Sequence, residues 1–169
     1  MSEKSPLIQF ICALDPQGHG TVIAEKQDEF TPPKHETPQN FMWYHLNAGA
    51  PHCHDFLKNL GLENWVVQNL TAQDTRPRFE MTDKGYMLIL RGVNLNPDAD
   101  LDDMISLRCW VQNDKIITVG RRSLKSIADI VADIESPQSL FVHPTHLMIR
   151  IIRRLGERMS EPLLKIEET

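Results

Sequence analysis

The segment from Gln73 to Gly92 constrains the fold of this chain more than any other part of it. It begins with a rigid, basic stretch at Arg76-Pro77-Arg78 and continues into a turn from Thr82 to Gly85. The run from Tyr86 to Leu90 then predicts a buried strand, because it is short, apolar and bounded by turn residues. The segment contains no catalytic signature, so its residues predict a sheet and no chemistry.

Five further strands are predicted from apolar, strand-forming runs that adjoin turn residues. These runs are Leu7 to Leu14, Gly20 to Ile23, Phe41 to Asn47, Met104 to Val111 and Ile116 to Val119. A turn at Asp15 to Gly18 makes the first two a candidate hairpin, and a turn at Gln112 to Asp114 makes the last two another. The polar, proline-containing stretch from Glu25 to Asn40 is expected to be a loop.

Helices are predicted where apolar residues recur at spacings of three and four. The predicted helices are His52 to Leu60, Leu62 to Leu70, Ser123 to Ile134 and Pro144 to Ser160. Ser123 is expected to cap the third helix, Gly61 to stop the first, and Pro162 to end or kink the last. Strands and helices are mixed, which predicts an α/β (α+β) domain with a mixed sheet covered by helices.

Length and composition limit the class of protein. A chain of 169 residues with 41% apolar residues suits one domain, or one domain with an appendage. Its formal net charge of −5 argues against a nucleic-acid partner, since such domains are usually basic. No apolar run approaches the roughly 20 residues of a membrane-spanning helix, and no secretory signal is present, so we expect a soluble polypeptide. The three cysteines are expected to be buried, reduced thiols.

Two pairs of histidines are the candidate metal ligands. His52 and His54 flank a cysteine and precede an aspartate, and zinc accepts imidazole, thiolate and carboxylate. Residues two apart on a helix point about 200° apart, so these rings would converge only in an extended turn; the alternative is a polar helix start. His143 and His146 would share a helix face if the helix includes both, but two ligands leave tetrahedral zinc incomplete.

A cluster of arginines is the other candidate site. Arg150, Arg153, Arg154 and Arg158 fall at helical spacing, so most of them project from one side of the last predicted helix. They could form a basic surface that lines an assembly and binds anions or repels cations; the alternative is salt bridges to the surplus of acidic residues. The aspartate-rich range from Asn94 to Asp103 predicts a solvated loop, or alternatively a cation contact between protomers.

Signatures of enzymes are absent from the sequence. It contains no Gly-x-Gly-x-x-Gly, no Gly-x-x-x-x-Gly-Lys-[Ser/Thr] and no Gly-x-Ser-x-Gly. We therefore expect no enzymatic activity and no required cofactor. Zinc or another divalent cation is the candidate ligand.

Several blocks, in this order and spacing, resemble the cytoplasmic domain of CorA-type divalent-cation transporters. They are Trp43-Tyr-His-Leu-Asn47, Thr75-Arg-Pro-Arg78, Gly85 with Leu90-Arg-Gly-Val-Asn94, Met104-Ile-Ser-Leu-Arg-Cys-Trp110 and Ile117-Thr-Val-Gly-Arg-Arg122. The first block is similar to the Trp-x-His-Leu-Asn strand of the zinc-transporter branch, ZntB. Many magnesium-branch members have an aspartate where this chain has His45, which favours the zinc branch.

The resemblance implies an α/β/α sandwich on the cytoplasmic face of the inner (cell) membrane. Residues 1–137 would form this domain, and residues 138–169 would begin the helical region that leads toward a membrane part absent from this sequence. Full-length members are homopentamers whose domains form a funnel, so the implied partners are further copies of the chain and divalent cations. The fragment alone could be monomeric, and it would touch the membrane only through the missing C-terminal part.

The resemblance thus favours the soluble cytoplasmic domain of a zinc transporter, which forms and gates the funnel. Three alternatives stay open: a magnesium-transporter domain, a freestanding metal-sensing module of the same fold, and an unrelated α/β enzyme. The selectivity motif of the family, a Gly-x-Asn tripeptide beside the first transmembrane helix, is absent, because no run in these 169 residues is long and apolar enough to be that helix. Neither the direction of transport nor the choice between zinc and magnesium follows from the sequence.

Overall fold

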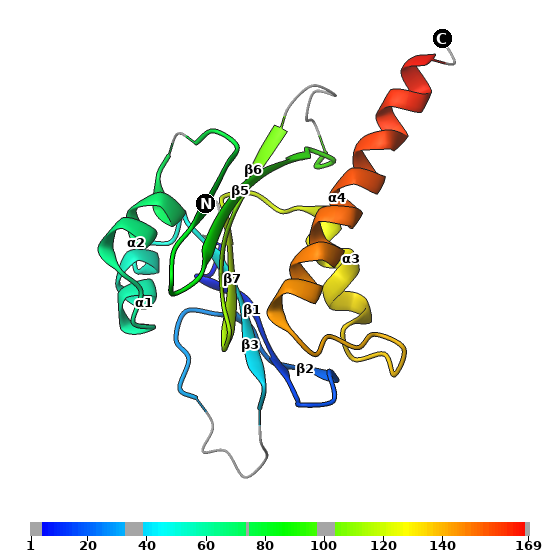
Figure 1. The fold of residues 1–169 in the computed structure, drawn as a ribbon. Coiled ribbons are helices and arrows are strands. Elements are labelled where there is room, and N and C mark those ends of the chain that lie inside the picture. The colour runs from blue at the N-terminus through cyan, green and yellow to red at the C-terminus, as the bar shows by residue number, and fades with distance from the viewer. Residues whose placement is uncertain (1–4, 33–38, 74, 98–103, 168–169) are drawn as a thin grey trace.

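One seven-stranded sheet runs through the middle of the molecule (Figure 1). The computed structural model describes residues 5–32, 39–73, 75–97 and 104–167, with side chains described as far as residue 160. The strands are β1 (Ile8–Leu14), β2 (Gly20–Gln27), β3 (Phe41–Asn47), β4 (Arg78–Met81), β5 (Tyr86–Val93), β6 (Met104–Gln112) and β7 (Lys115–Gly120). Five of them coincide closely with the predicted apolar runs, and β2 extends farther into the range expected to be a loop.

The sheet is mixed, as the sequence predicts. Its strand order is β2-β1-β3-β7-β6-β5-β4. The β1–β2 and β6–β7 pairs are the two predicted antiparallel hairpins. The β3–β7 pair is parallel, and it places Trp43 beside Ile116 and His45 beside Thr118. Segments more than 70 residues apart in the sequence therefore meet at the centre of the sheet.

Four helices cover the two faces of the sheet, which confirms the α/β/α arrangement. They are α1 (Cys53–Asn59), α2 (Asn64–Thr71), α3 (Lys125–Asp133) and α4 (Pro144–Glu167). Helices α1 and α2 lie on one face, and α3 and α4 lie on the other (Figure 1). The C-terminal half of α4 extends past the sheet (Figure 1).

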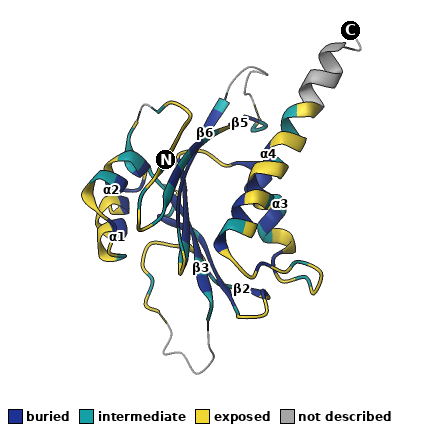
Figure 2. Ribbon diagram, in the orientation of Figure 1, coloured by how far each residue is buried: buried dark blue, intermediate teal, exposed yellow. Residues whose placement is uncertain are grey.

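Each face of the sheet has its own apolar core, because successive side chains of a strand point to opposite faces. Along β7, Ile116 belongs to the core under α3 and α4, whereas Ile117 and Val119 belong to the core under α1 and α2. Figure 2 shows the result: the strands are buried, and the helices expose one side. The cysteines expected to be buried thiols are all buried and free.

Two predicted helix boundaries are wrong. Ser123 does not cap α3, because the N-cap position belongs to Leu124, which makes no side-chain cap hydrogen bond. Leu124 is buried in the core instead, so apolar burial fixes the start of this helix. Pro162, which was expected to end or kink α4, does not end it, because the helix continues to Glu167. Extending a formed helix costs far less than starting one, so the loss of a single backbone donor does not stop it.

Gly61 ends α1 as predicted. Its φ is +85°, in the left-handed region that favours glycine, and its N–H donates to the Lys58 carbonyl at 2.9 Å. No pattern in the sequence predicts β4, a short strand at the sheet edge that pairs with β5. This strand is mostly exposed, with Phe79 57% exposed, so it lacks the apolar burial that marks the others. No helix in the described ranges is both long and apolar enough to cross a membrane.

Candidate functional site

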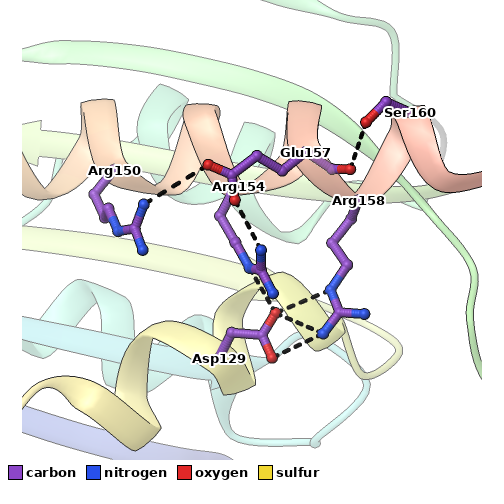
Figure 3. A network of polar contacts seen from close by, with 6 residues as sticks. All are labelled: Asp129, Arg150, Arg154, Glu157, Arg158 and Ser160. Atoms are coloured by element: carbon purple, nitrogen blue, oxygen red, sulfur yellow. Dashed lines mark hydrogen bonds and ion pairs between the residues drawn. The ribbon is translucent and has the colours of Figure 1, made fainter.

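The arginines of α4 meet an aspartate of α3 on the outer side of the two helices (Figure 3). Arg158 donates to Asp129 from Nε at 3.0 Å and from Nη2 at 2.9 and 3.0 Å. Arg154, one helical turn earlier, donates from Nε to Asp129 Oδ2 at 2.8 Å. We call this contact of Asp129 with Arg154 and Arg158 the Asp129 anchor. It joins the helix that leaves the domain to a helix that packs on the sheet.

Glu157 extends the anchor along α4. Arg154 donates from Nη1 to Glu157 Oε2 at 2.7 Å, and Arg150 Nη1 lies 3.9 Å from Glu157 Oε1. Arg153 lies exposed on the same helix and makes no hydrogen bond or ion pair with the described part of the chain. Three of the four candidate arginines thus lie in a network with two carboxylates, as the salt-bridge alternative describes.

The anchor holds its acidic groups in the charged form. Partial burial alone would raise the pKa of Asp129, but the hydrogen bonds from Arg158 and Arg154 outweigh it and lower that pKa. The hydrogen bond from Arg154 likewise lowers the pKa of Glu157. The side chains of Arg154, Arg158 and Asp129 are 25%, 22% and 29% exposed, so solvent screens these pairs only in part.

An apolar contact lies beneath the anchor. On the inner side of α4, Leu147, Met148, Ile151 and Leu155 are buried in the same core as the α3 residues Ile127 and Ile130. Burial of this stripe supplies most of the attachment, because exposed ion pairs contribute little by themselves. The Asp129 anchor therefore sets the angle and rotation of α4 rather than its attachment as such.

The two histidine pairs lie apart from the anchor and from each other. His52 occupies the N-cap position of α1 without a side-chain cap bond, and His54 is exposed in the first turn of that helix. The rings of His143 and His146 have centroids 6.1 Å apart, and His143 Nδ1 accepts a hydrogen bond from the Thr145 N–H at 3.1 Å. No group of three or more histidine, cysteine, aspartate or glutamate residues that could hold a metal occurs within the described ranges. Most of the aspartate-rich range, residues 98–103, lies outside them.

Buried polar side chains of the sheet form a chain of hydrogen bonds that the sequence did not indicate. We call the chain from Trp43 through Thr118 to His45 the relay. Trp43 Nε1 donates to Thr118 Oγ1 at 3.0 Å, and the same hydroxyl lies 2.8 Å from His45 Nδ1. His45 is 8% exposed and Thr118 is fully buried. Burial lowers the pKa of His45 to about 4, and a hydrogen bond with Thr118 offsets part of that effect. His45 is therefore a neutral imidazole at physiological pH.

Sequence reasoning missed Asp129 and Thr118 because their partners are distant in the chain. Asp129 contacts residues 25 and 29 positions later, and Thr118 contacts residues 75 and 73 positions earlier. The one available signal was the Trp43-x-His45 spacing, which places both side chains on one face of a strand.

Comparisons with known proteins place the chain in a family. The family model described as "CorA-like Mg2+ transporter protein" matches residues 38–169. "Divalent cation transporter CmaX" of Pseudomonas aeruginosa is 35% identical over 101 residues, which cover 59% of this chain and 30% of the relative. "Zinc transport protein ZntB" of Vibrio parahaemolyticus is 31% identical over 145 residues, which cover 83% of this chain and 44% of the relative. The chain thus spans less than half the length of either relative.

Solved structures agree with this placement. The full-length CmaX protein superposes with a TM-score of 0.84 at 25% identity, over 99% of this chain and 51% of that one. The ZntB cytoplasmic domain of Vibrio parahaemolyticus superposes with a TM-score of 0.79 at 24% identity, over 96% of this chain and 63% of that one. The chain belongs to the CorA-like Mg2+ transporter protein family, in the branch that contains the ZntB proteins.

Proposed function

We propose that this chain is the cytoplasmic domain of a divalent-cation transporter of the zinc branch. The observation that carries the proposal is the similarity to ZntB over 83% of the chain, together with the family match. The fold common to this chain and the ZntB cytoplasmic domain supports it. The relatives are named as transporters, so the domain would serve an ion pathway and would carry out no chemistry of its own.

The role proposed for the domain is to form and gate a funnel at the cytoplasmic face of the inner (cell) membrane. Residues 1–137 would form the body, and residues 138–169 would start the helical region toward the membrane. Helix α4 suits that role, since its first half packs on the core and its second half extends away from the sheet. The Asp129 anchor would then transmit movements of the body to this helix.

In the whole protein the domain would assemble as a homopentamer around the ion path. Its proposed partners are further copies of itself and divalent cations, with no nucleic acid and no required cofactor. Arg150 and Arg153 would remain available to line the funnel, because Arg150 has only a long ion pair at 3.9 Å and Arg153 is exposed. Light scattering of the whole protein in detergent would test the pentamer.

Magnesium transport is the second candidate. The specific observation in its favour is that the description of the matching family names Mg2+. The name of CmaX refers to divalent cations in general. His45 favours zinc only through the family resemblance, since its ring is engaged with Thr118 in the sheet.

Ion flux decides between the two. The whole protein that contains this domain would be reconstituted in liposomes loaded with a zinc-sensitive or a magnesium-sensitive dye. We expect zinc entry well above that of protein-free liposomes, and little magnesium entry. Magnesium flux in excess of zinc flux would favour the second candidate, and the absence of flux of either ion would overturn the transporter proposal.

A further inference from the structure

The two edges of the sheet differ in how far they are closed to a further strand. Strand β2 forms one edge and β4 forms the other. On β2, the Val22 N–H donates to Glu135 Oε1 at 2.9 Å, and Lys26 has a φ of +46°, which departs from strand geometry. Such side-chain cover and backbone irregularity keep an edge from accepting another strand. Strand β4 has neither, since its register with β5 is regular from Arg78 to Met81.

The backbone groups of Phe79 and Met81 form the free edge of β4. The Thr82 N–H donates to the Gly85 carbonyl at 2.8 Å, so Thr82 directs its backbone toward β5. Bonded and non-bonded pairs alternate along an antiparallel ladder, so Glu80 also faces β5, whereas Phe79 and Met81 direct their N–H and C=O groups outward. No side chain in the described part of the chain bonds to these outward groups, so the edge has room for a further strand.

The side chains of this open edge are apolar. Phe79 is 57% exposed and Met81 is 68% exposed, the highest values among the exposed large apolar side chains of the described ranges. Phe79 lies opposite Leu88 and Met81 lies opposite Tyr86, and residues that face each other across two strands share a face of the sheet. Leu88 and Tyr86 pack against the core under α3 and α4, so Phe79 and Met81 extend that face beyond the helices.

Helix α4 forms the other side of an apolar corner. The Thr145 hydroxyl lies 3.0 Å from the Tyr86 hydroxyl, so this flank of α4 faces the β5 end of the sheet. Ile149 and Ile152 follow Thr145 at spacings of four and three, which places them on the same flank, and they are 48% and 43% exposed. The Asp129 anchor lies on the opposite flank. We call the exposed side chains of Phe79, Met81, Ile149 and Ile152 the apolar corner.

The charges of β4 are self-complementary. Arg78 and Glu80 project from the other face of the strand and form an ion pair within it. If two β4 strands run antiparallel with Phe79 at the twofold axis, Arg78 of each copy lies opposite Glu80 of the other. The register that joins Phe79 to Met81 would instead set Glu80 against Glu80. Opposite charges at facing positions stabilise a strand pair and like charges destabilise it, so the first register is favoured.

We propose that β4 pairs antiparallel with β4 of a second copy of this chain, with the two Phe79 residues facing each other at the twofold axis. Each Phe79 N–H then donates to the Phe79 carbonyl of the other copy, and each Met81 N–H donates to the Pro77 carbonyl of the other copy. Pro77 has no N–H, so the pairing ends there. The side chains of Phe79 and Met81 from both copies gather on one face between the two α4 helices, where each copy removes apolar surface of the other from water.

The contact is weak and stops at two chains. A strand of four residues buries less than the roughly 1,200 Å² of a stable interface, so the dimer should depend on concentration. A twofold contact uses the same surface on both copies, and the remaining edges, β2, are closed. Such a contact differs from the head-to-tail contacts of a ring of five. The inference is therefore independent of the proposed function and requires only the folded chain.

Sedimentation velocity of the 169-residue chain tests the association. We expect the average mass to rise from that of one chain toward that of two as the concentration increases to about 1 mM, a range that detects even millimolar dissociation constants. A mass of one chain throughout this range would overturn the proposal. Assemblies that grow beyond two chains would contradict it as well.

Single cysteines locate the contact, because the native cysteines are all buried. Phe79→Cys places two thiols on a bonded cross-strand pair, whose Cα atoms lie about 5.5 Å apart, within reach of a disulfide. Met81→Cys is the control at a similarly exposed position of β4, and its Cα atoms would lie about 14 Å apart, out of reach. On mild oxidation we expect at least about fivefold more linked dimer from Phe79→Cys. Equal yields, or a higher yield from Met81→Cys, would rule out the proposed register.

Charge exchange separates the contact between copies from the ion pair within β4. Arg78→Glu leaves only negative charge at the facing positions, and Glu80→Arg leaves only positive charge. Each variant alone should therefore associate at least about tenfold more weakly than the parent chain. An equal mixture of the two restores both pairs across the contact, so heterodimers should form with about the parent affinity. Both side chains are more than 40% exposed, so the variants stay folded. A mixture that associates no better than its components would overturn the proposal.

Discussion

Arg158 of α4 donates hydrogen bonds to both carboxylate oxygens of Asp129 of α3, with three nitrogen-to-oxygen distances of 2.9 to 3.0 Å (Figure 3). The fork of a guanidinium matches a carboxylate in this way, so the contact fixes orientation as well as distance. Arg154 binds the same carboxylate from one turn away. The rotation of α4 about its own axis is thereby tied to α3, at the point where α4 begins to leave the domain.

Asp129→Asn should loosen α4 without unfolding the domain. The asparagine amide is neutral and has only one acceptor oxygen, so it cannot form ion pairs with both guanidinium groups. The apolar stripe of α4 beneath it stays buried. We expect a loss of about 1 kcal/mol in the free energy of unfolding, because the pair is partly exposed. Chemical denaturation measures that loss, and hydrogen exchange of the α4 amides should rise.

Asp133→Asn is the control for the anchor variant, since Asp133 is an exposed aspartate at the end of the same helix. It should leave both stability and exchange close to those of the parent chain. The effect of Asp129→Asn should shrink in about 1 M salt, which screens charges beyond roughly 3 Å. Equal exchange rates in the two variants would show that the anchor does not hold α4.

The stability of the domain should fall with acid through His45. Burial lowers the pKa of His45 from 6.5 to about 4, so the folded state binds its proton less readily than the unfolded chain does. The stability that this group contributes is fully present above pH 6.5 and is lost as the pH falls from there through about 4. From this difference in pKa between the unfolded and folded states, the free energy of unfolding should fall by about 3 kcal/mol between pH 7 and pH 4.

Urea unfolding at several pH values measures this loss. His45→Asn keeps a polar group that can hydrogen-bond with Thr118 but does not titrate, so its stability should fall less steeply between pH 7 and pH 4. His54→Asn, at an exposed histidine of α1, controls for the substitution itself. Parallel curves for the parent chain and His45→Asn would contradict a neutral, buried His45.

Thr118→Val removes the hydroxyl that joins Trp43 to His45. Valine keeps the shape of threonine but leaves the Trp43 N–H and His45 Nδ1 without a partner inside the sheet. We expect a loss of about 1–3 kcal/mol in unfolding free energy, the usual cost of an unpaired buried polar group. Thr21→Val, on the exposed side of β2, should change stability by much less. Similar melting curves for the two variants would rule out the relay as a stabilising unit.

Two glycines should respond to alanine in opposite directions. A Cβ on Gly85 would lie 2.3 Å from the Val111 carbonyl oxygen and 3.0 Å from the Trp110 ring, so the backbone would have to move. Gly85→Ala is expected to cost about 1–3 kcal/mol. A Cβ on Gly156 in α4 would meet nothing within 4 Å, and Gly156→Ala should stabilise the helix by about 0.5–1 kcal/mol. Thermal unfolding of both variants checks the opposite signs.

Zinc titration by calorimetry tests the two histidine pairs. Each pair offers two imidazoles, and a structural zinc site has four ligands, so binding at either pair should be weak. His52→Ala with His54→Ala, and separately His143→Ala with His146→Ala, should each remove the heat of one weak site. An isotherm unchanged by a double variant would eliminate that pair as a zinc contact.

The strands show how far the sequence leads and where it stops. Runs such as Tyr86 to Leu90 predicted buried strands correctly, because burial demands apolar residues in a short, turn-bounded segment. Strand β4 was not predicted, because an exposed edge strand does not require a run of apolar residues. Ser123 has the chemistry of a cap, but burial of the neighbouring Leu124 set the start of α3. Local preference is thus overruled wherever the core gains more from another arrangement.

The sequence by itself determined the alternation of apolar and polar residues, the two hairpins, and the side of α4 on which the arginines lie. These are local properties, set by periods of 2 and about 3.6 residues along the chain. Tertiary structure alone decided that Asp129 meets Arg154 and Arg158, and that Thr118 links Trp43 to His45. Such pairs depend on the parallel β3–β7 contact and on the packing of α3 against α4, in which residues distant along the chain become neighbours.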